Sequence, residues 1–272
     1  MRLTTTLIFI ASVALPGTVL AQDIEAKREG LQITVGTGII AAPTYLGDDD
    51  YQTSVFPNIT LRYGERFTAS LRGLEFAAIS SSGWRAGPVL RYDFGRDERP
   101  DDSPFVIADD PTTDLVGLGD IDGTVELGGF VEYEARSFAA KLELRQGVDG
   151  GHDGLLGEAS LSYRGQFAAI GRQAFYSVGP AISFGDDAYN DTFFGVSAVQ
   201  STASGISQFD ADGGVNSIGL HSSAMMPLTE KTSLVGFLKY DQLVGDVGDS
   251  SIVTERGSKD QVTAGLFINY TF

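Results

Sequence analysis

The chain has 272 residues, 34 glycines, no cysteine and a formal net charge of −17. A sequence without cysteine excludes a disulfide framework and any thiolate metal site. The negative charge argues strongly against nucleic-acid binding, because it repels phosphates, and it also argues against a simple anion pore. A mean hydropathy of +0.01 with 17 phenylalanines and 10 tyrosines is unusual for a soluble acidic protein. It is typical of a membrane barrel, whose strands alternate apolar and polar residues.

The first 21 residues have the pattern of a cleavable secretory signal. Arg2 supplies a positive charge, residues 7–15 form an apolar run and Pro16 ends it. The run is too short to span a bilayer as an anchor. Cleavage is predicted between Ala21 and Gln22, which removes Arg2 and leaves a mature charge of −18, one unit below that of the full chain. We therefore expect residues 1–21 to be a signal peptide and residues 22–272 to form one exported barrel domain.

The mature chain begins with segments of period-2 alternation, which predicts strands. These segments are residues 31–39, 55–63, 67–79 and 84–94. Within the third, the alternation slips at Gly73–Leu74, and we predict a β-bulge there. The fourth places Arg85 and Arg91 together on one face. Burying unpaired arginines in an apolar core would cost several kcal/mol each, whereas a wet barrel lumen accommodates them.

The next two predicted strands, residues 125–133 and 138–145, carry charges of both signs on one face. Opposite charges on facing strands pair favourably. A two-sheet sandwich would instead turn these charges toward water, so this pattern alone leaves a sandwich open. The side chains predicted to line a barrel lumen are Arg85, Arg91, Glu126, Glu132, Lys141 and Arg145.

Six further strands are predicted over residues 155–163, 171–184, 192–199, 215–226, 233–243 and 261–272. The last has apolar residues at alternate positions and ends the chain on an aromatic residue. Such an apolar edge strand is an aggregation hazard in a soluble protein. It has the length and alternation of the strand that closes a transmembrane barrel. Ile268, Tyr270 and Phe272 resemble the signal that barrel-insertion machinery recognises.

The predicted fold is therefore all-β, a transmembrane antiparallel β-barrel of about 12 strands, with 10 or 14 strands as alternatives. No mature segment contains the run of about 18 apolar residues that a membrane helix requires. Aromatic girdles mark the two membrane interfaces of such barrels. The candidates are Tyr63, Trp84, Tyr92, Phe94, Tyr240, Tyr270 and Phe272.

The longest irregular stretch, residues 96–123, carries nine aspartates and glutamates. An even number of strands places both termini in the periplasm. Counting back from the closing strand then places residues 96–123 on the periplasmic side. This placement is unexpected, because barrels usually put long loops outside. Either the strand count is off by one hairpin, or this acidic loop has a periplasmic role.

Three stretches, residues 36–64, 179–205 and 257–272, resemble the MipA/OmpV family of outer-membrane proteins. The core DDAYNDTFFGV at residues 186–196 is the most specific of them. The motif residues that match are Tyr45, Gly47, Asp48, Asp187, Tyr189, Phe194, Gly195 and Val196. The resemblance covers essentially the whole mature chain. One departure is the net charge, since family members often have a more basic balance of charged residues than this acidic chain. It implies a location in the Gram-negative outer membrane and a scaffold role between murein-synthesising and murein-cleaving enzymes.

Few side chains suggest catalysis or metal binding. His152, in the segment DGGHDG, could orient an acid–base pair or bind a metal ion, but a solvated turn is the favoured interpretation. His221 could activate a serine in a hydrolase, yet no G-x-S-x-G elbow is present, and a lumen-lining role is favoured. Residues 48–50 are three aspartates that could hold Ca²⁺ or bridge ions to lipopolysaccharide. They lack the spacing of a calcium loop, which favours a solvated turn.

We therefore predict a non-enzymatic barrel with no cofactor, no catalytic residue and no metal ligand. Its expected partners are outer-membrane lipid, lipopolysaccharide, the insertion machinery and, through the resemblance, a murein transglycosylase and a penicillin-binding protein. The periplasm-facing turns would dock the murein enzymes, with residues 96–123 as the candidate segment. The alternative is a small solute channel, and an enzyme inside the barrel is a weaker third possibility.

Overall fold

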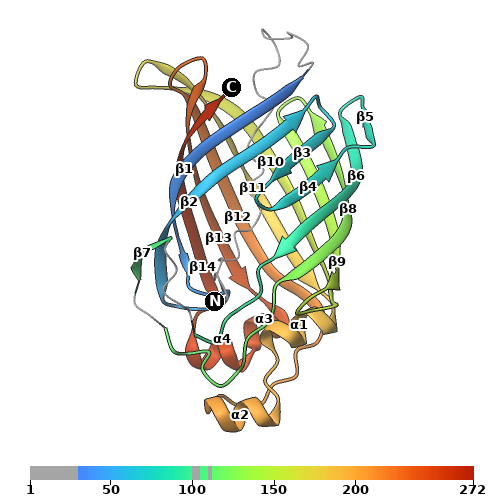
Figure 1. Cartoon of the computed structure of the whole chain (residues 1–272), viewed down its shortest axis with the longest axis vertical. Coiled ribbons are helices and arrows are strands. Elements are labelled where there is room, and N and C mark those ends of the chain that lie inside the picture. Colours follow the sequence, from blue (N-terminus) through green and yellow to red (C-terminus); the bar gives the residue numbers. More distant parts are fainter. Residues whose placement is uncertain (1–29, 100–104, 110–111) are drawn as a thin grey trace, which may run out of the picture.

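The protein is a closed antiparallel β-barrel of 12 strands (Figure 1). It is seen in a computed structural model that describes residues 30–99, 105–109 and 112–272. The predicted signal peptide and its cleavage position, Ala21 and Gln22, lie outside the described residues. Among the described residues, no helix combines the length and the apolar character needed to cross a membrane.

Ten long strands form most of the barrel wall, and hydrogen bonds between β1 and β14 close the ring. The predicted closing strand is therefore present as β14. The ten strands are β1 (Leu31–Pro43), β2 (Tyr51–Tyr63), β6 (Trp84–Asp93), β8 (Thr124–Ala135), β9 (Phe138–Asp149), β10 (Leu155–Ala169), β11 (Arg172–Gly185), β12 (Gly214–Pro227), β13 (Thr232–Leu243) and β14 (Asp260–Thr271).

The wall is one sheet thick, and its strands alternate as the sequence predicts. In β14, Leu266 and Ile268 are 47% and 48% exposed, whereas Gln261 and Asn269 are only 4% and 5% exposed. The exposed apolar side chains form the outer surface, which in a transmembrane barrel faces lipid. The polar side chains face the lumen. Because a single closed sheet accounts for both faces, the two-sheet sandwich is wrong.

The predicted third strand, residues 67–79, is in fact a short antiparallel hairpin. Its strands are β3 (Phe67–Ser70) and β4 (Gly73–Phe76), which join β2 to β6 within the ring. Gly73 has φ +131°, and a Cβ added there would lie 2.0 Å from the carbonyl oxygen of Leu90. The slip at Gly73–Leu74 therefore marks a reversal of the chain, and the predicted bulge is wrong. Two more short strands, β5 (Ile79–Ser81) and β7 (Val106–Asp109), pair with β6 and β2 without extending the ring.

The predicted ninth strand, residues 192–199, is also wrong, because this segment is mostly helical. Asp186 caps the first helix by accepting a hydrogen bond from the Tyr189 N–H. Ser197 caps the second, in a capping box that Gln200 completes. The helices are α1 (Asp187–Phe194), α2 (Ala198–Ser204), α3 (Gly245–Asp249) and α4 (Ser251–Arg256). The total of 12 ring strands still matches the prediction, because the β3–β4 hairpin adds the strand that this segment removes.

The two ends of the barrel have different connections (Figure 1). The end that holds the C-terminus has the short turns 64–66, 82–83, 136–137, 170–171 and 228–231. The opposite end has the longer connections and the four helices of the described chain. Outer-membrane barrels have short periplasmic turns and longer extracellular loops. We therefore assign the end with the C-terminus to the periplasm.

The described parts of residues 96–123, which are 96–99, 105–109 and 112–123, lie at the extracellular end. The prediction that this stretch is periplasmic is wrong. The cause is the false strand at residues 192–199, which shifts the count back from β14 by one strand. This shift inverts the side of each loop between the β3–β4 hairpin and residue 192, whereas the strand that the hairpin adds restores the side of the loops before it.

Aromatic side chains gather on the outer surface near both ends. Near the periplasmic end, the ring of Tyr270 lies 4.9 Å from that of Phe272, measured between ring centroids. Near the extracellular end, the rings of Tyr92 and Phe94 lie 5.0 Å apart. The seven candidates for aromatic girdles are all 36% exposed or more: Tyr63, Trp84, Tyr92, Phe94, Tyr240, Tyr270 and Phe272. Two such bands are typical of a barrel that spans a membrane.

Candidate functional site

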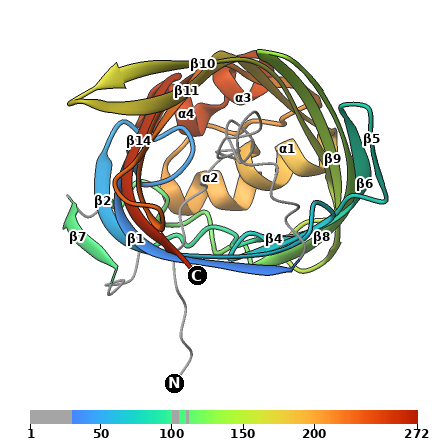
Figure 2. The same cartoon turned by 90° about the horizontal axis from the view of Figure 1, so that it is seen from above.

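A cap of helices and loops with an apolar core lies across the extracellular mouth of the barrel (Figure 2). We define the cap as residues 44–50, 94–99, 112–123, 150–154, 186–213 and 244–259, which belong to the five strand connections at this end. One cluster of buried side chains joins Leu156, Tyr189, Phe193, Phe194, Ala211, Leu243, Val247 and Val253. A second joins Tyr45, Leu115, Leu118, Val196, Ile206 and Ile252. The mouth therefore has a packed core of its own.

The family-motif residues lie in this cap, although they come from two separate connections. Tyr45, Tyr189, Phe194 and Val196 are between 1% and 7% exposed. The Tyr45 hydroxyl donates to the Arg256 carbonyl at 3.1 Å. Ser250 donates to the Phe194 carbonyl at 2.6 Å, and Val196 pairs with Phe209 through the backbone. Gly47 and Gly195 are buried beside them, whereas Asp187 is exposed and accepts from the Gly213 N–H at 2.7 Å.

Asp48 is a buried carboxylate of the cap, so the predicted solvated turn is wrong for this residue. It is 0% exposed, whereas Asp49 is exposed. The Thr44 hydroxyl donates to one oxygen, and the Asp50 N–H donates to the other at 3.1 Å. Burial raises the pKa of Asp48 to about 6, although both hydrogen bonds favour its charged form. Asp48, Asp50 and Asp114 lie close together, but both Asp48 oxygens already have these partners.

Arg96 fastens the β6–β8 connection to the rest of the cap. Its guanidinium Nη1 donates to the carbonyl of Phe193 in α1. Burial lowers the pKa of Arg96 to about 10, so the side chain stays charged at neutral pH. Its backbone also pairs with Ile121 across the connection. This segment is thus part of the cap at the extracellular end.

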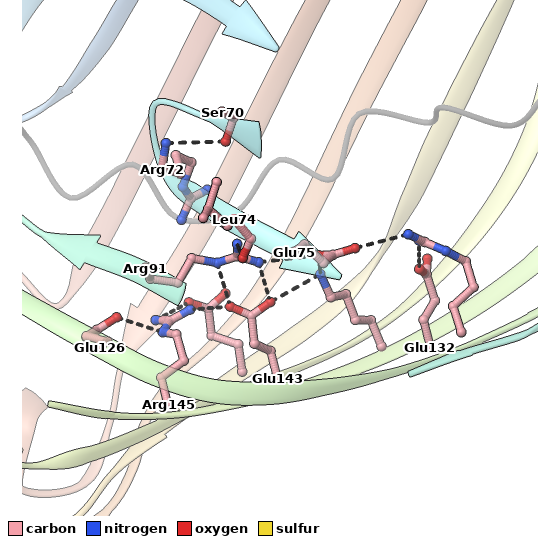
Figure 3. A network of polar contacts seen from close by, with 12 residues as sticks. Ser70, Arg72, Leu74, Glu75, Arg91, Glu126, Glu132, Glu143 and Arg145 are labelled. Carbon is pink, nitrogen blue, oxygen red and sulfur yellow. Dashed lines mark hydrogen bonds and ion pairs between the residues drawn. The ribbon is translucent and has the colours of Figure 1, made fainter. Parts of the chain in front are cut away.

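Below the cap, ion pairs cover one side of the lumen wall (Figure 3). Glu75 of β4 lies 3.1 Å from Arg85 and 3.3 Å from Arg91, both on β6. Lys141 of β9 lies 3.2 Å from the same carboxylate. On the other side of Arg85, Glu132 of β8 lies 2.7 Å away. Charges of both signs therefore neutralise one another along the wall, which offsets their loss of contact with bulk water.

Arg145 is the second centre of this network. It lies 3.0 Å from Glu126, 2.9 Å from Glu143 and 3.2 Å from Glu158. The structure therefore brings together, on the lumen side of one stretch of wall, Arg85, Arg91, Glu126, Glu132, Lys141 and Arg145.

Sequence reasoning missed several members of the network. Glu75 is missed because its hairpin was interpreted as part of one long strand. Glu158 and Arg164 occupy inward positions of β10, where Arg164 lies 2.7 Å from Glu134. The period-2 pattern of β10 could have identified both of them.

The two histidines differ in their surroundings. His221 of β12 lies 2.8 Å from Asp241 of β13, measured from Nε2 to Oδ1, and its side chain is 26% exposed. His152 is 5% exposed and packs against Tyr189 and Phe193, so the predicted solvated turn is wrong here as well. Its imidazole lies beside Glu126 and Asp93.

The three residues that resemble an insertion signal lie on the outer face of the last strand and at its end. Ile268, Tyr270 and Phe272 are 48%, 40% and 69% exposed. This placement does not test their role in barrel insertion, which stays a prediction.

Several solved barrels share the general form of this structure. They include CdiB from Acinetobacter baumannii, with 10% identity and a TM-score of 0.36, matched over 90% of this chain and 60% of that one. The anion-selective porin from Comamonas acidovorans has 11% identity, a TM-score of 0.31 and coverage of 89% and 98%. OprG from Pseudomonas aeruginosa has 10% identity, a TM-score of 0.26 and coverage of 90% and 97%. Likenesses this distant carry no argument about function.

Sequence comparison gives a firmer assignment. No curated protein matches the chain significantly. The family described as MltA-interacting protein MipA, in contrast, matches residues 35–272, which include every strand of the ring except the first residues of β1. With its outward apolar belt and closed ring, the chain is an outer-membrane β-barrel. It belongs to the MltA-interacting protein MipA family.

Proposed function

We propose that this protein is a non-enzymatic outer-membrane scaffold that docks murein-processing enzymes at its periplasmic end. The observation that carries this proposal is the cap. An open diffusion pore needs a continuous water path, whereas here two buried apolar clusters lie in the cap at the extracellular mouth. Phe194 and Ile206, for example, are 2% and 0% exposed. A closed barrel is suited to display surfaces on either side of the membrane, and the family description names a murein-enzyme partner.

The periplasmic turns are the surface on which we place the partner. They and their flanking residues carry Arg66, Arg136, Arg172 and Lys231 but only two acidic residues, Glu65 and Glu230. The turns themselves are therefore locally basic in a chain whose overall charge is −17. Complementary charge speeds encounter with an acidic partner and fixes its orientation. Residues 96–123 are no longer the docking candidate, because they lie at the extracellular end.

The alternative function is a narrow solute channel. The charged lumen wall below the cap favours it, because such a wall would hold water. Planar-bilayer recording separates the two functions. We expect the purified parent barrel to give no steady conductance steps, and regular ion-selective steps from it would favour the channel.

Docking is tested by retention of purified murein transglycosylase and penicillin-binding protein on the immobilised barrel in detergent. We expect Arg66→Glu/Arg136→Glu to weaken retention about tenfold, because it reverses two charges of the periplasmic end. The matched control is Asp49→Lys/Asp153→Lys, which reverses two exposed charges of the cap. Equal retention by the parent and both variants would count against docking at the periplasmic turns.

A further inference from the structure

Three potential metal ligands meet where the lumen wall joins the cap. Asp93 is the last residue of β6, Glu126 lies in β8, and His152 lies in the connection between β9 and β10. They are 8%, 2% and 5% exposed. One ligand atom from each lies within 4.8 Å of the other two. Residues far apart in the sequence thus place one imidazole and two carboxylates around a single point.

Three buried polar atoms of this cluster have no hydrogen-bond partner among the described residues. The His152 side chain is 0% exposed, yet neither ring nitrogen has a hydrogen-bond partner among the described residues. Its Nε2 lies 3.4 Å from Oε1 of Glu126. Among the described residues, this Glu126 oxygen accepts no hydrogen bond either. Buried polar atoms are nearly always hydrogen-bonded. Their convergence here indicates a ligand between them.

The position of His152 is held by its surroundings. The Thr124 hydroxyl accepts from the backbone N–H groups of Gly151 at 2.8 Å and His152 at 3.1 Å. The ring packs nearly perpendicular to Tyr189, with 5.2 Å between the ring centroids. Gly147 leaves room for it, because a Cβ there would lie 2.7 Å from Nδ1. The imidazole is thus fixed before any ion binds, as metal sites require.

The local charge also favours a cation. Oε2 of Glu126 lies 3.0 Å from Nε of Arg145, but Arg145 also forms ion pairs with Glu143 and Glu158. Asp93 accepts from the Gly95 N–H at 2.7 Å. Around the His152 ring there are thus two carboxylates, Asp93 and Glu126, and one guanidinium that pairs with Glu126, that of Arg145. Buried charge of this kind is normally balanced by a partner ion.

We propose that Asp93, Glu126 and His152 bind one divalent transition-metal ion. An imidazole with two carboxylates suits Zn²⁺, whereas Ca²⁺ and Mg²⁺ prefer oxygen ligands alone. Zinc bonds to nitrogen and oxygen are about 2.0–2.2 Å long, so shifts of about 1 Å or less bring all three ligands to the ion. The ion joins β6, β8 and the 150–154 connection, and so fastens the cap to the wall. This site is independent of the proposed scaffold function.

The test uses the full mature chain, refolded into detergent with one equivalent of ZnCl₂ and then desalted. Metal content is measured by mass spectrometry on the barrel that shows the altered gel mobility of a folded protein. We expect a one-to-one zinc content in the parent. His152→Ala and Glu126→Gln lower zinc affinity by about tenfold or more, as loss of a ligand does. The matched control, His221→Ala, removes the other histidine and keeps the zinc.

Co²⁺ provides a second measurement that needs no variant. We expect visible absorption bands when the parent is refolded with Co²⁺, and Zn²⁺ should displace them whereas Ca²⁺ should not. If His152→Ala and Glu126→Gln do not fold, zinc binding by Asp93→Asn and the cobalt spectrum of the parent test the proposed site. The proposal is overturned by a parent without zinc or cobalt bands, by bands that Ca²⁺ displaces, or by a folded His152→Ala that binds zinc as tightly as His221→Ala.

Discussion

Arg91 and Glu143 form a two-bond ion pair that reaches across an intervening strand. Nε of Arg91 donates to Oε1 of Glu143 at 3.0 Å, and Nη2 donates to Oε2 at 2.9 Å. Arg91 lies on β6 and Glu143 on β9, with β8 between them in the ring. The pair therefore connects two strands that share no backbone hydrogen bond, and it does so on the lumen side of the wall.

We expect Glu143→Gln to lower the free energy of unfolding by about 3 kcal/mol. The change removes the one carboxylate with which Arg91, Lys141 and Arg145 all pair, and removing one partner of a buried pair is strongly destabilising. Urea titration of the barrel in lipid bilayers measures the effect. The control Glu65→Gln changes an exposed turn residue and should stay within about 0.5 kcal/mol of the parent. Equal stability of the two variants would show that the network does not stabilise the wall.

Replacing both partners of the pair gives a different expectation. Arg91→Met/Glu143→Leu should cost less than the sum of the single changes Arg91→Met and Glu143→Leu, because no charge of the pair is left without its partner. The same urea titration, arranged as a double-mutant cycle, measures the coupling. Simple additivity would mean that the two side chains act independently.

The hairpin of β3 and β4 depends on a glycine with a positive φ. Gly73→Ala should lower the free energy of unfolding by about 3 kcal/mol, since its φ is +131° and a Cβ would meet the Leu90 carbonyl oxygen at 2.0 Å. Gly171→Ala is the matched control, because its φ is +71° but nothing lies within 4 Å of an added Cβ. It should cost about 1 kcal/mol. Equal losses would mean that the close approach to Leu90 is unimportant.

The long strands could be predicted from the sequence because lipid on one side and a wet lumen on the other impose a period of two. The strand predicted at residues 192–199 (TFFGVSAV) did not follow this rule, because apolar and polar residues do not alternate there. There the capping signals were the better guide: Ser197 with Gln200 forms a capping box, and Asp186 precedes α1. Helix caps in the extracellular connections therefore deserve more weight than a short segment rich in apolar residues.

The candidate metal site could not be predicted from local sequence. DGGHDG has the composition of a solvated turn, and nothing within it indicates burial. His152 becomes buried only because Tyr189 and Phe193, about forty positions later in the sequence, pack over it. Its ligand partners Asp93 and Glu126 lie on strands that the loop does not adjoin in sequence. Only the closed ring, with its cap, brings these residues together.

Asp48 makes the stability of the cap depend on pH. Its folded pKa of about 6 lies above the ordinary value of 3.8, so the folded state favours the protonated form. The stability that Asp48 contributes is full below about pH 4 and is lost as the pH rises through about 6. The loss by pH 7 is about 2 to 3 kcal/mol.

Asp48→Asn should remove this dependence. Between pH 4 and pH 7, the thermal unfolding temperature of the parent should fall relative to that of Asp48→Asn. The control Asp49→Asn changes an exposed neighbour and should follow the parent. Parallel pH profiles for the parent and Asp48→Asn would contradict the raised pKa of Asp48.

The cap can be opened without touching the wall. Phe194 is 2% exposed in the main apolar cluster, and Phe194→Ala should destabilise the cap by about 3–5 kcal/mol through the cavity it leaves. We expect planar-bilayer recordings of this variant to show conductance bursts that the parent lacks, because the charged lumen below then meets water at both ends. Val199→Ala is the control, since Val199 is 80% exposed on α2 and should leave the barrel silent. A Phe194→Ala barrel that stays folded and silent would mean that the cap core is not what closes this barrel.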